Sequence, residues 1–139
     1  MVQYIFLYGV ARNILNDNDC CSIRSAKAPG MKLAINDHKN IPTLSVTWDL
    51  YDYVLGDAVK ICNDKKFIEI VQKLDSFAVG FSRKIIQVKI NGKSKPVDAF
   101  AYFANDMKAY KEIDDHSYNE WFEEMIKKSD ADYEIVDKV

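Results

Sequence analysis

The residues best placed to do chemistry form a turn after the first apolar run of the chain. Tyr8 and Gly9 end that run, and Val10, Ala11 and Arg12 follow them. Glycine permits a tight turn and a close approach of the backbone to a ligand. Successive backbone N–H groups in such a turn can hold an anion. The segment therefore predicts either an anion-binding turn or an ordinary turn after a strand.

The cysteines and histidines do not form a recognisable site. The chain has three cysteines, Cys20, Cys21 and Cys62, and two histidines, His38 and His116. An odd count argues against a disulfide framework and favours a reducing cytoplasm, and the apolar context of Cys62 predicts a buried structural thiol. Neither histidine has a Cys or His at ligand spacing, so we expect no metal site. A cysteine nucleophile stays open, because the spacing in sequence does not fix distances in space.

Length and composition indicate one globular domain over residues 1–139. The chain is 48% hydrophobic and 29% charged, which is ordinary for a globular protein of this size. A net charge of −2 without a basic run gives no case for binding a nucleic acid polymer. No apolar run is long enough to cross a membrane, and the N-terminus lacks the features of a signal peptide. We expect a cytoplasmic protein, whose oligomeric state the sequence leaves open.

Short apolar or alternating runs predict strands through most of the chain. Gly56, inside one of them, marks a bulge or a close backbone approach. Asn91 and Gly92 are a strong signal for a type I′ hairpin. Residues 13–28 have little periodicity and read as a loop with at most a short helix. The expected strands are residues 2–8, 31–35, 42–48, 51–61, 81–90 and 96–104.

Two segments have the signals of helices. Asn63 is a suitable N-cap, and after it apolar residues recur every three or four positions as far as Phe77. Ser117 and Glu120 form a capping box, which opens a second helix with an apolar face over residues 121–126. The alternation of strands with these helices indicates a mixed α and β protein.

Four short motifs occur in order along residues 3–104. They are Tyr-Gly-Val-Ala-Arg at 8–12, Val-Leu-Gly-Asp-Ala-Val at 54–59, the stretch from Leu-Asp to Ser-Arg at 74–83, and Ala-Phe-Ala-Tyr at 99–102. This layout resembles the γ-glutamylcyclotransferase-like family, also called BtrG-like. That family typically shows Tyr-Gly-x-x-Arg, Val-x-Gly-x-Val-Tyr, Leu-Asp-x-x-Glu-Gly before Tyr-x-Arg, and Ala-x-Val-Tyr. No single motif is specific, and the resemblance depends on all four being in register.

The resemblance implies an α+β fold, a small twisted mixed β-barrel with flanking helices and a cavity at one end. The turn from Tyr8 to Arg12 would line that cavity and hold the polar head of a γ-glutamyl group, with Tyr102 on the wall. In the implied reaction the α-amine of the substrate attacks its own γ-carbonyl, closes a 5-oxoproline ring and expels an amine. A carboxylate must carry the proton, and no metal or organic cofactor is needed.

The chain departs from the family pattern at the residue that carries this proton. The family's Glu corresponds to Ala78, and alanine cannot carry a proton. The nearest acids, Asp75 and Glu69, do not occupy the matched position. We therefore expect the chain as written to be inactive, either through natural loss of the Glu or through a substitution that traps a bound substrate.

The prediction is an enzyme that, in its native form, cleaves a γ-glutamyl or amino-acid-like conjugate by intramolecular cyclisation. The alternative is a catalytically silent module that sequesters a small molecule or contacts a protein. The expected ligand is an anionic or amino-acid-like small molecule, bound with the help of Arg12 or Arg83. Arg83 would otherwise be a solvated arginine on its strand.

Overall fold

The computed structural model describes most of the barrel-forming part of the chain. The described residues are 2–9, 15, 21–36, 42–47, 49, 51–114, 120 and 123. The second helix expected after Ser117 lies almost wholly outside the described residues, and so does its apolar face at 121–126.

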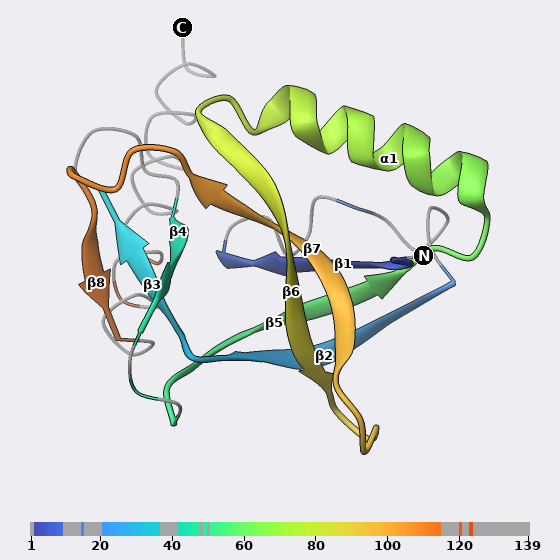
Figure 1. Cartoon of the computed structure of the whole chain (residues 1–139), viewed down its shortest axis with the longest axis horizontal. Coiled ribbons are helices and arrows are strands. Elements are labelled where there is room, and N and C mark those ends of the chain that lie inside the picture. The colour runs from blue at the N-terminus through green and yellow to red at the C-terminus, as the bar shows by residue number, and fades with distance from the viewer. Residues whose placement is uncertain are drawn as a thin grey trace, which may run out of the picture.

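Five strands close into a barrel (Figure 1). Their order around the barrel is β1-β5-β2-β6-β7, and the parallel pairing of β1 with β7 closes it, while the other pairs are antiparallel. This confirms the predicted α+β fold with a small mixed β-barrel. The strands are β1 (Tyr4–Tyr8), β2 (Ser22–Pro29), β5 (Tyr53–Lys60), β6 (Phe81–Ile90) and β7 (Val97–Ala104).

The barrel interior combines small and large side chains from alternate positions of the strands. Ala26, Ala58 and Ala99 lie in the same buried cluster as Phe6 and Phe103. Alternation along a strand places every second residue on the inner face, and small residues opposite aromatic ones let the interior of a narrow barrel fill completely. The alternation also leaves a second set of residues facing outward, which the helix covers on one side.

Gly56 lies where β5 passes close to β1. A Cβ added there would lie 2.4 Å from the carbonyl oxygen of Leu7 and 2.6 Å from Cζ of Phe6. The register continues through Gly56, which pairs with Tyr8 on one side and Ala26 on the other. The close backbone approach predicted at this glycine is therefore confirmed, and the strand has no bulge there.

One helix, α1 (Asp64–Phe77), crosses the outer side of the barrel (Figure 1). The side chain of Asn63 accepts a hydrogen bond from the Lys66 N–H at 3.0 Å, which confirms the predicted N-cap. The buried face of the helix packs on outward residues of β1 and β5 and on the residue after β5. This second apolar cluster includes Phe67, Ile70, Val71 and Leu74 from the helix and Ile5, Leu7, Val59 and Ile61 from below it.

A three-stranded sheet, in the order β4-β3-β8, extends the barrel at one end. Its strands are β3 (Met31–Ile35), β4 (Thr43–Val46) and β8 (Lys111–Ile113). The Ala104 N–H donates a hydrogen bond to Oγ1 of Thr43 at 2.8 Å, and Leu33 and Leu44 belong to the barrel's own cluster. The small sheet and the barrel therefore share one core.

Two local expectations were wrong. The segment 13–28 was expected to be a loop, but its residues from Ser22 onward form most of β2. Backbone pairing with β5 and β6 holds this strand although its sequence lacks apolar alternation. The hairpin at Asn91 and Gly92 forms, with Lys93 N–H donating to the Ile90 carbonyl at 3.0 Å. Its connection nevertheless spans residues 91–96, which is longer than the two-residue loop of a type I′ hairpin.

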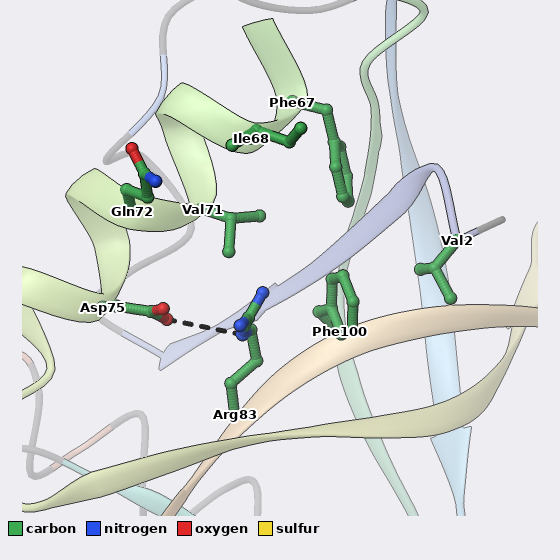
Figure 2. Close-up of a pocket in the computed structure, with 8 residues that line it drawn as sticks. All are labelled: Val2, Phe67, Ile68, Val71, Gln72, Asp75, Arg83 and Phe100. Carbon is green, nitrogen blue, oxygen red and sulfur yellow. Dashed lines mark ion pairs between the residues drawn. The ribbon is translucent and has the colours of Figure 1, made fainter. Parts of the chain in front are cut away.

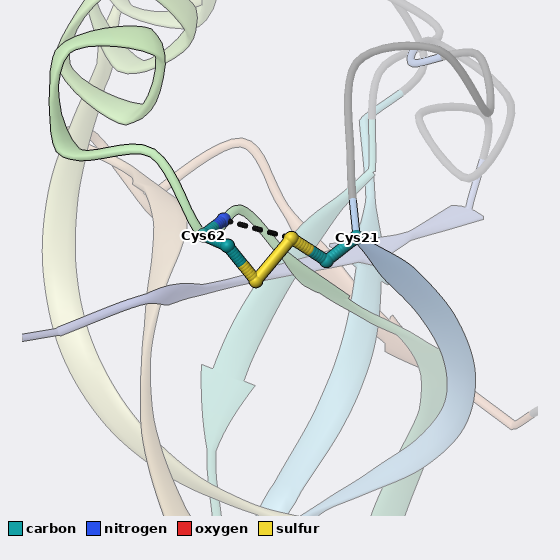
Figure 3. The surroundings of a disulfide bond; sticks show 2 residues. All are labelled: Cys21 and Cys62. Atoms are coloured by element: carbon teal, nitrogen blue, oxygen red, sulfur yellow. Dashed lines mark hydrogen bonds between the residues drawn. A yellow bond between two sulfur atoms is a disulfide. The ribbon is translucent and has the colours of Figure 1, made fainter.

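Cys21 and Cys62 form a disulfide (Figure 3). Ser22 pairs with Lys60 in the β2–β5 register, and the Cys21 N–H donates to the Lys60 carbonyl at 2.8 Å. The register thus brings the two cysteines to a Cα separation of 6.0 Å, within the range of disulfides. The expectation of free thiols was wrong, and Cys62 is exposed rather than buried. An odd cysteine count does not prevent one pair from bonding, so the cysteines give no reason to expect a reducing compartment.

The described part of the chain contains no helix with the length and apolarity needed to cross a bilayer. It also contains no group of three or more His, Cys, Asp or Glu residues arranged to hold a metal ion.

Candidate functional site

A pocket of about 360 Å³ lies between α1 and the outward faces of β6 and β7 (Figure 2). Most of its wall is apolar, and Asp75 and Arg83 are its two ionisable residues. A mostly apolar cavity with a few converging polar groups is typical of small-molecule sites. The lining residues are Val2, Phe67, Ile68, Val71, Gln72, Asp75, Arg83 and Phe100.

The helix and the strands bring these side chains together through their periodicities. Ile68, Gln72 and Asp75 are spaced by four and three residues, so they share one stripe of α1 at the edge of its buried face. Phe100 and Tyr102 are alternate residues of β7 and face outward toward the helix. The β6–β7 register pairs Tyr102 with Arg83. The charged end of the pocket is therefore built by three elements.

Asp75 binds two partners at this end. Its carboxylate accepts a hydrogen bond of 2.5 Å from the Tyr102 hydroxyl, and it forms an ion pair with the Arg83 guanidinium at 3.5 Å. Figure 2 shows the Asp75 and Arg83 side chains pointing toward each other across the gap between α1 and β6. The Arg83 guanidinium also lies 4.7 Å from the centre of the Phe100 ring.

The Tyr102 hydroxyl is held in its neutral form. Burial, and then the hydrogen bond and negative charge of Asp75, raise the pKa of Tyr102 well above its usual range, while the charge of Arg83 acts in the opposite direction. Tyr102 is therefore a hydrogen-bond donor to Asp75 at any physiological pH. It orients the carboxylate at the edge of the pocket.

The two described residues of the predicted turn, Tyr8 and Gly9, are not among the residues that line this pocket. Tyr8 is buried inside the barrel, where its hydroxyl donates to the Tyr102 carbonyl at 2.6 Å and accepts from the Leu44 N–H at 3.2 Å. These bonds join β1, β7 and β4. Gly9 has a φ of 58°, a left-handed conformation that glycine adopts easily.

Three residues of that turn, Val10, Ala11 and Arg12, lie outside the described residues. The anion-binding role of the turn therefore stays a prediction, as does the part expected of Arg12.

Ala78 ends α1 and is not among the residues that line the pocket. Its N–H donates to the Leu74 carbonyl at 3.0 Å, and its own carbonyl accepts from the Phe81 N–H at 3.0 Å. The carboxylate that does reach the pocket is that of Asp75, about one helical turn earlier. Of the residues proposed from the sequence, Arg83 lines the pocket and Tyr102 lies against its acid.

The apolar wall was not anticipated from the sequence. Phe67 and Val71 fit the buried face of the predicted helix, and that face in fact borders the cavity as well as the core. Nothing in the sequence marked Val2 or Phe100 as a pocket residue. Each is an ordinary apolar residue, Val2 just before β1 and Phe100 within β7. No pattern in the sequence joins Asp75 to Arg83, because their contact depends on how closely the end of α1 approaches β6.

No protein-family model and no curated protein matches the sequence. The structure nevertheless resembles several solved structures. One is the solution structure of At3g28950.1 from Arabidopsis thaliana, with 16% identity, a TM-score of 0.64, and coverage of 98% of this chain and 84% of that one. Another is At5g39720.1 from the same plant, with 15% identity, a TM-score of 0.61, and coverage of 91% and 87%.

A third solved structure bears the name of an enzyme. It is a γ-glutamyl cyclotransferase, with 15% identity and a TM-score of 0.53, and the match covers 79% of this chain and 69% of that one. At such low identity the likeness concerns the arrangement of the backbone, and it agrees with the mixed barrel and the crossing helix α1 described above. The chain has the fold of γ-glutamyl cyclotransferase.

Proposed function

We propose that this protein binds an amino-acid-like small molecule in the pocket under α1. The observation that supports this most is the Asp75–Arg83 ion pair at one end of an apolar cavity. An acid and a base side by side complement the ammonium and carboxylate groups of a zwitterion. The apolar wall, with Phe67 and Phe100 stacked at a centroid distance of 5.8 Å, accommodates the remainder of the ligand.

Opening the ion pair for a ligand costs little. The side chains of Asp75 and Arg83 are 41% and 35% exposed, and ion pairs in such positions contribute little to stability. A ligand carboxylate on Arg83 and a ligand ammonium on Asp75 replace one solvated pair with two pairs that the pocket partly shields. The exchange therefore favours a zwitterion over a ligand with one charge.

Binding without turnover fits the groups present better than catalysis does. The family reaction needs a carboxylate that takes a proton from the substrate ammonium and returns it to the leaving amine. Ala78 supplies none, and Asp75 already accepts the Tyr102 hydroxyl at 2.5 Å. Proton transfer to Asp75 would compete with that bond.

A second candidate function is cyclotransfer on a γ-glutamyl conjugate with Asp75 as the proton carrier. The placement of Asp75 favours it, because this is the acid of the Leu-Asp motif and it borders the cavity. In this reaction the substrate amine forms a bond to the γ-carbonyl carbon, the amide C–N bond breaks, and the proton passes to the departing amine through the carboxylate.

Calorimetry tests the binding proposal. The ligands are γ-glutamyl dipeptides, free apolar amino acids, and analogues of each that lack either the amine or the carboxylate. Arg83→Gln should weaken binding of the zwitterions by about 10- to 100-fold, the effect expected from losing a hydrogen bond to a charged group. Lys84→Gln is the matched control, since it removes the same charge from the opposite face of the same strand.

The outcomes separate the two candidates. Saturable binding of zwitterions that weakens in Arg83→Gln and not in Lys84→Gln supports the binding proposal. Equal affinity for the single-charge analogues, or no binding at all, contradicts it. Release of 5-oxoproline by the unmodified protein, abolished in Asp75→Asn, establishes the enzyme instead.

A further inference from the structure

The end of the barrel where β1 and β2 begin carries a group of inward-facing cations. Tyr4 pairs with Lys60, and two residues further along Phe6 pairs with Ala58, which in turn pairs with Arg24. Directly paired residues point to the same face of a sheet. Because Phe6 and Ala58 belong to the barrel core, Tyr4, Arg24 and Lys60 belong to the same inner face. They form its last layer, where the barrel opens to solvent.

The β6–β7 connection adds a third cation to this layer. The Lys93 ammonium donates a hydrogen bond to the Tyr4 hydroxyl at 2.8 Å and lies 5.4 Å from the centre of its ring. The Lys60 ammonium lies 5.8 Å from the same ring. The Arg24 guanidinium lies beside Gly92, where an added Cβ would be 3.3 Å from Nη2. We call Tyr4, Arg24, Lys60 and Lys93 the basic mouth.

Within the described part of the chain, the positive charges of the basic mouth have no acidic partner. Among the residues that the structure describes, Arg24, Lys60 and Lys93 form no ion pair. The adjacent strands carry two acids, Asp57 and Asp98. Each precedes an inward-facing alanine of its strand, so its own side chain points outward. The protein as a whole is acidic, with a net charge of −2, so this convergence is local.

Three cations gathered around Tyr4 and Gly92, with no described acid paired to them, repel one another, and a bound anion removes the repulsion. A carboxylate offers a single charge and two oxygens. A phosphate group offers up to two charges and at least three oxygens, which can engage a planar guanidinium and two ammonium groups together. Lys93 keeps two donors for a ligand, because only one is used on Tyr4.

We propose that the basic mouth binds the phosphate group of a small molecule, a phosphate monoester or a short polyphosphate. This site lies at the opposite end of the barrel strands from Arg83 and Tyr102, and it does not depend on the function proposed for the pocket under α1. Tyr4 forms the floor of the site and holds the Lys93 ammonium in place, and the apolar barrel core beneath it keeps the ligand at the surface.

Titration calorimetry at low ionic strength tests the proposal with three probes, inorganic phosphate, pyrophosphate and phenyl phosphate. Lys60→Gln/Lys93→Gln should weaken binding of the tightest probe by at least about tenfold, through loss of two charge-assisted contacts. The matched control is Lys27→Gln/Lys89→Gln. It also removes two cations, which lie opposite each other in the β2–β6 register on the outward face. A higher affinity for phenyl phosphate than for pyrophosphate indicates a monoester ligand. A higher affinity for pyrophosphate indicates a polyphosphate.

A single variant distinguishes binding at the basic mouth from non-specific attraction to positive charge. Tyr4→Phe keeps the ring and the net charge but removes the hydroxyl that positions Lys93, and it should weaken binding severalfold. Equal losses in the two double variants, no effect of Tyr4→Phe, or absence of saturable binding would overturn the site. Tighter binding of an RNA or DNA oligonucleotide, reduced equally in both double variants, would also overturn it in favour of a non-specific surface.

Discussion

At the scale of single residues, the candidate site depends on the Asp75 carboxylate, which interacts with both Tyr102 and Arg83. Asp75 accepts a hydrogen bond from Tyr102 and faces the charge of Arg83. The tyrosine stays neutral because of burial and of its acidic neighbour. Asp75 is therefore oriented by a donor behind it and open to a ligand on its other side. This arrangement suits the capture of an ammonium group better than the repeated transfer of a proton.

The raised pKa of Tyr102 gives a prediction for alkaline pH. The folded protein holds this phenol above its usual pKa of 10.0, so the group contributes stability below that pH and the contribution is lost as the pH rises past it. We expect the stability of the unmodified protein to fall more steeply above this pH than that of Tyr102→Phe. Urea unfolding across the alkaline range measures the difference, and parallel curves would show that Tyr102 ionises normally.

Ala78 gives a second prediction at this scale. If the pocket holds a γ-glutamyl group as the family does, Ala78→Glu restores the missing proton carrier, and 5-oxoproline release should rise at least about 100-fold over the unmodified protein. Ala78→Gln is the control, because it has the same size without a carboxylate. Failure of both variants to release 5-oxoproline would mean that the pocket does not hold such a substrate in the required orientation.

Some of the site was predictable from the sequence, and the reason differs from residue to residue. Arg83 and Tyr102 could be proposed because they lie in motifs whose order resembles that of a known family. The ion pair of Arg83 with Asp75 could not, because it depends on how closely the end of α1 approaches β6. Tyr8 was expected at the site, and the described structure uses its hydroxyl to join three strands.

At the scale of elements, the sequence predicts those that bury a continuous face. The helix after Asn63 and the strand at 81–90 have clear periodicity and are confirmed. β2 has almost none, because Ala26 and Ala28 are its only buried side chains and both are small. Its strand conformation depends on hydrogen bonds to β5 and β6, which are contacts distant in sequence.

The close approach of β1 and β5 at Gly56 leaves no room for a side chain at this position of the barrel wall. Gly56→Ala would place a methyl group against the backbone of Leu7 and the ring of Phe6. We expect a loss of about 1–3 kcal/mol in the free energy of unfolding, the usual cost of overpacking. Chemical denaturation monitored by circular dichroism measures it.

Gly80→Ala is the control for this variant. Gly80 has a φ of 83° and no neighbouring atom within 4 Å of an added Cβ, so its substitution reports backbone strain without a steric clash. Strain in the left-handed region costs about 1–2 kcal/mol. The two variants should differ in their effect on the barrel core, because only Gly56→Ala places a methyl group against core atoms. Gly56→Ala should therefore broaden the NMR signals of barrel residues, and Gly80→Ala should not. Unchanged spectra in Gly56→Ala would contradict the close approach.

At the scale of the whole molecule, the two ends of the barrel have different chemistry. One end carries the paired charges of Asp75 and Arg83 beside an apolar cavity, and the other carries the cations of the basic mouth. The helix covers one side between them and the small sheet extends the core (Figure 1).

The disulfide between Cys21 and Cys62 ties the start of β2 to the segment that leads into α1 (Figure 3). It closes a loop with a sequence separation of 41, and a crosslink of this length restricts the unfolded chain. Removing it should cost about 2–5 kcal/mol in the free energy of unfolding. Cys62→Ser and the reduced protein should lose similar amounts in urea denaturation, because each opens the same loop.

Cys20→Ser provides the matched control, since it removes a neighbouring thiol and leaves the bonded pair intact. Its unfolding midpoint should stay that of the oxidised protein and should fall on addition of a dithiol reductant. A midpoint that does not respond to reductant would show that the bond contributes nothing to stability. A loss in Cys20→Ser as large as that in Cys62→Ser would show that Cys20 takes part in the crosslink, because only the bonded cysteines constrain the unfolded chain.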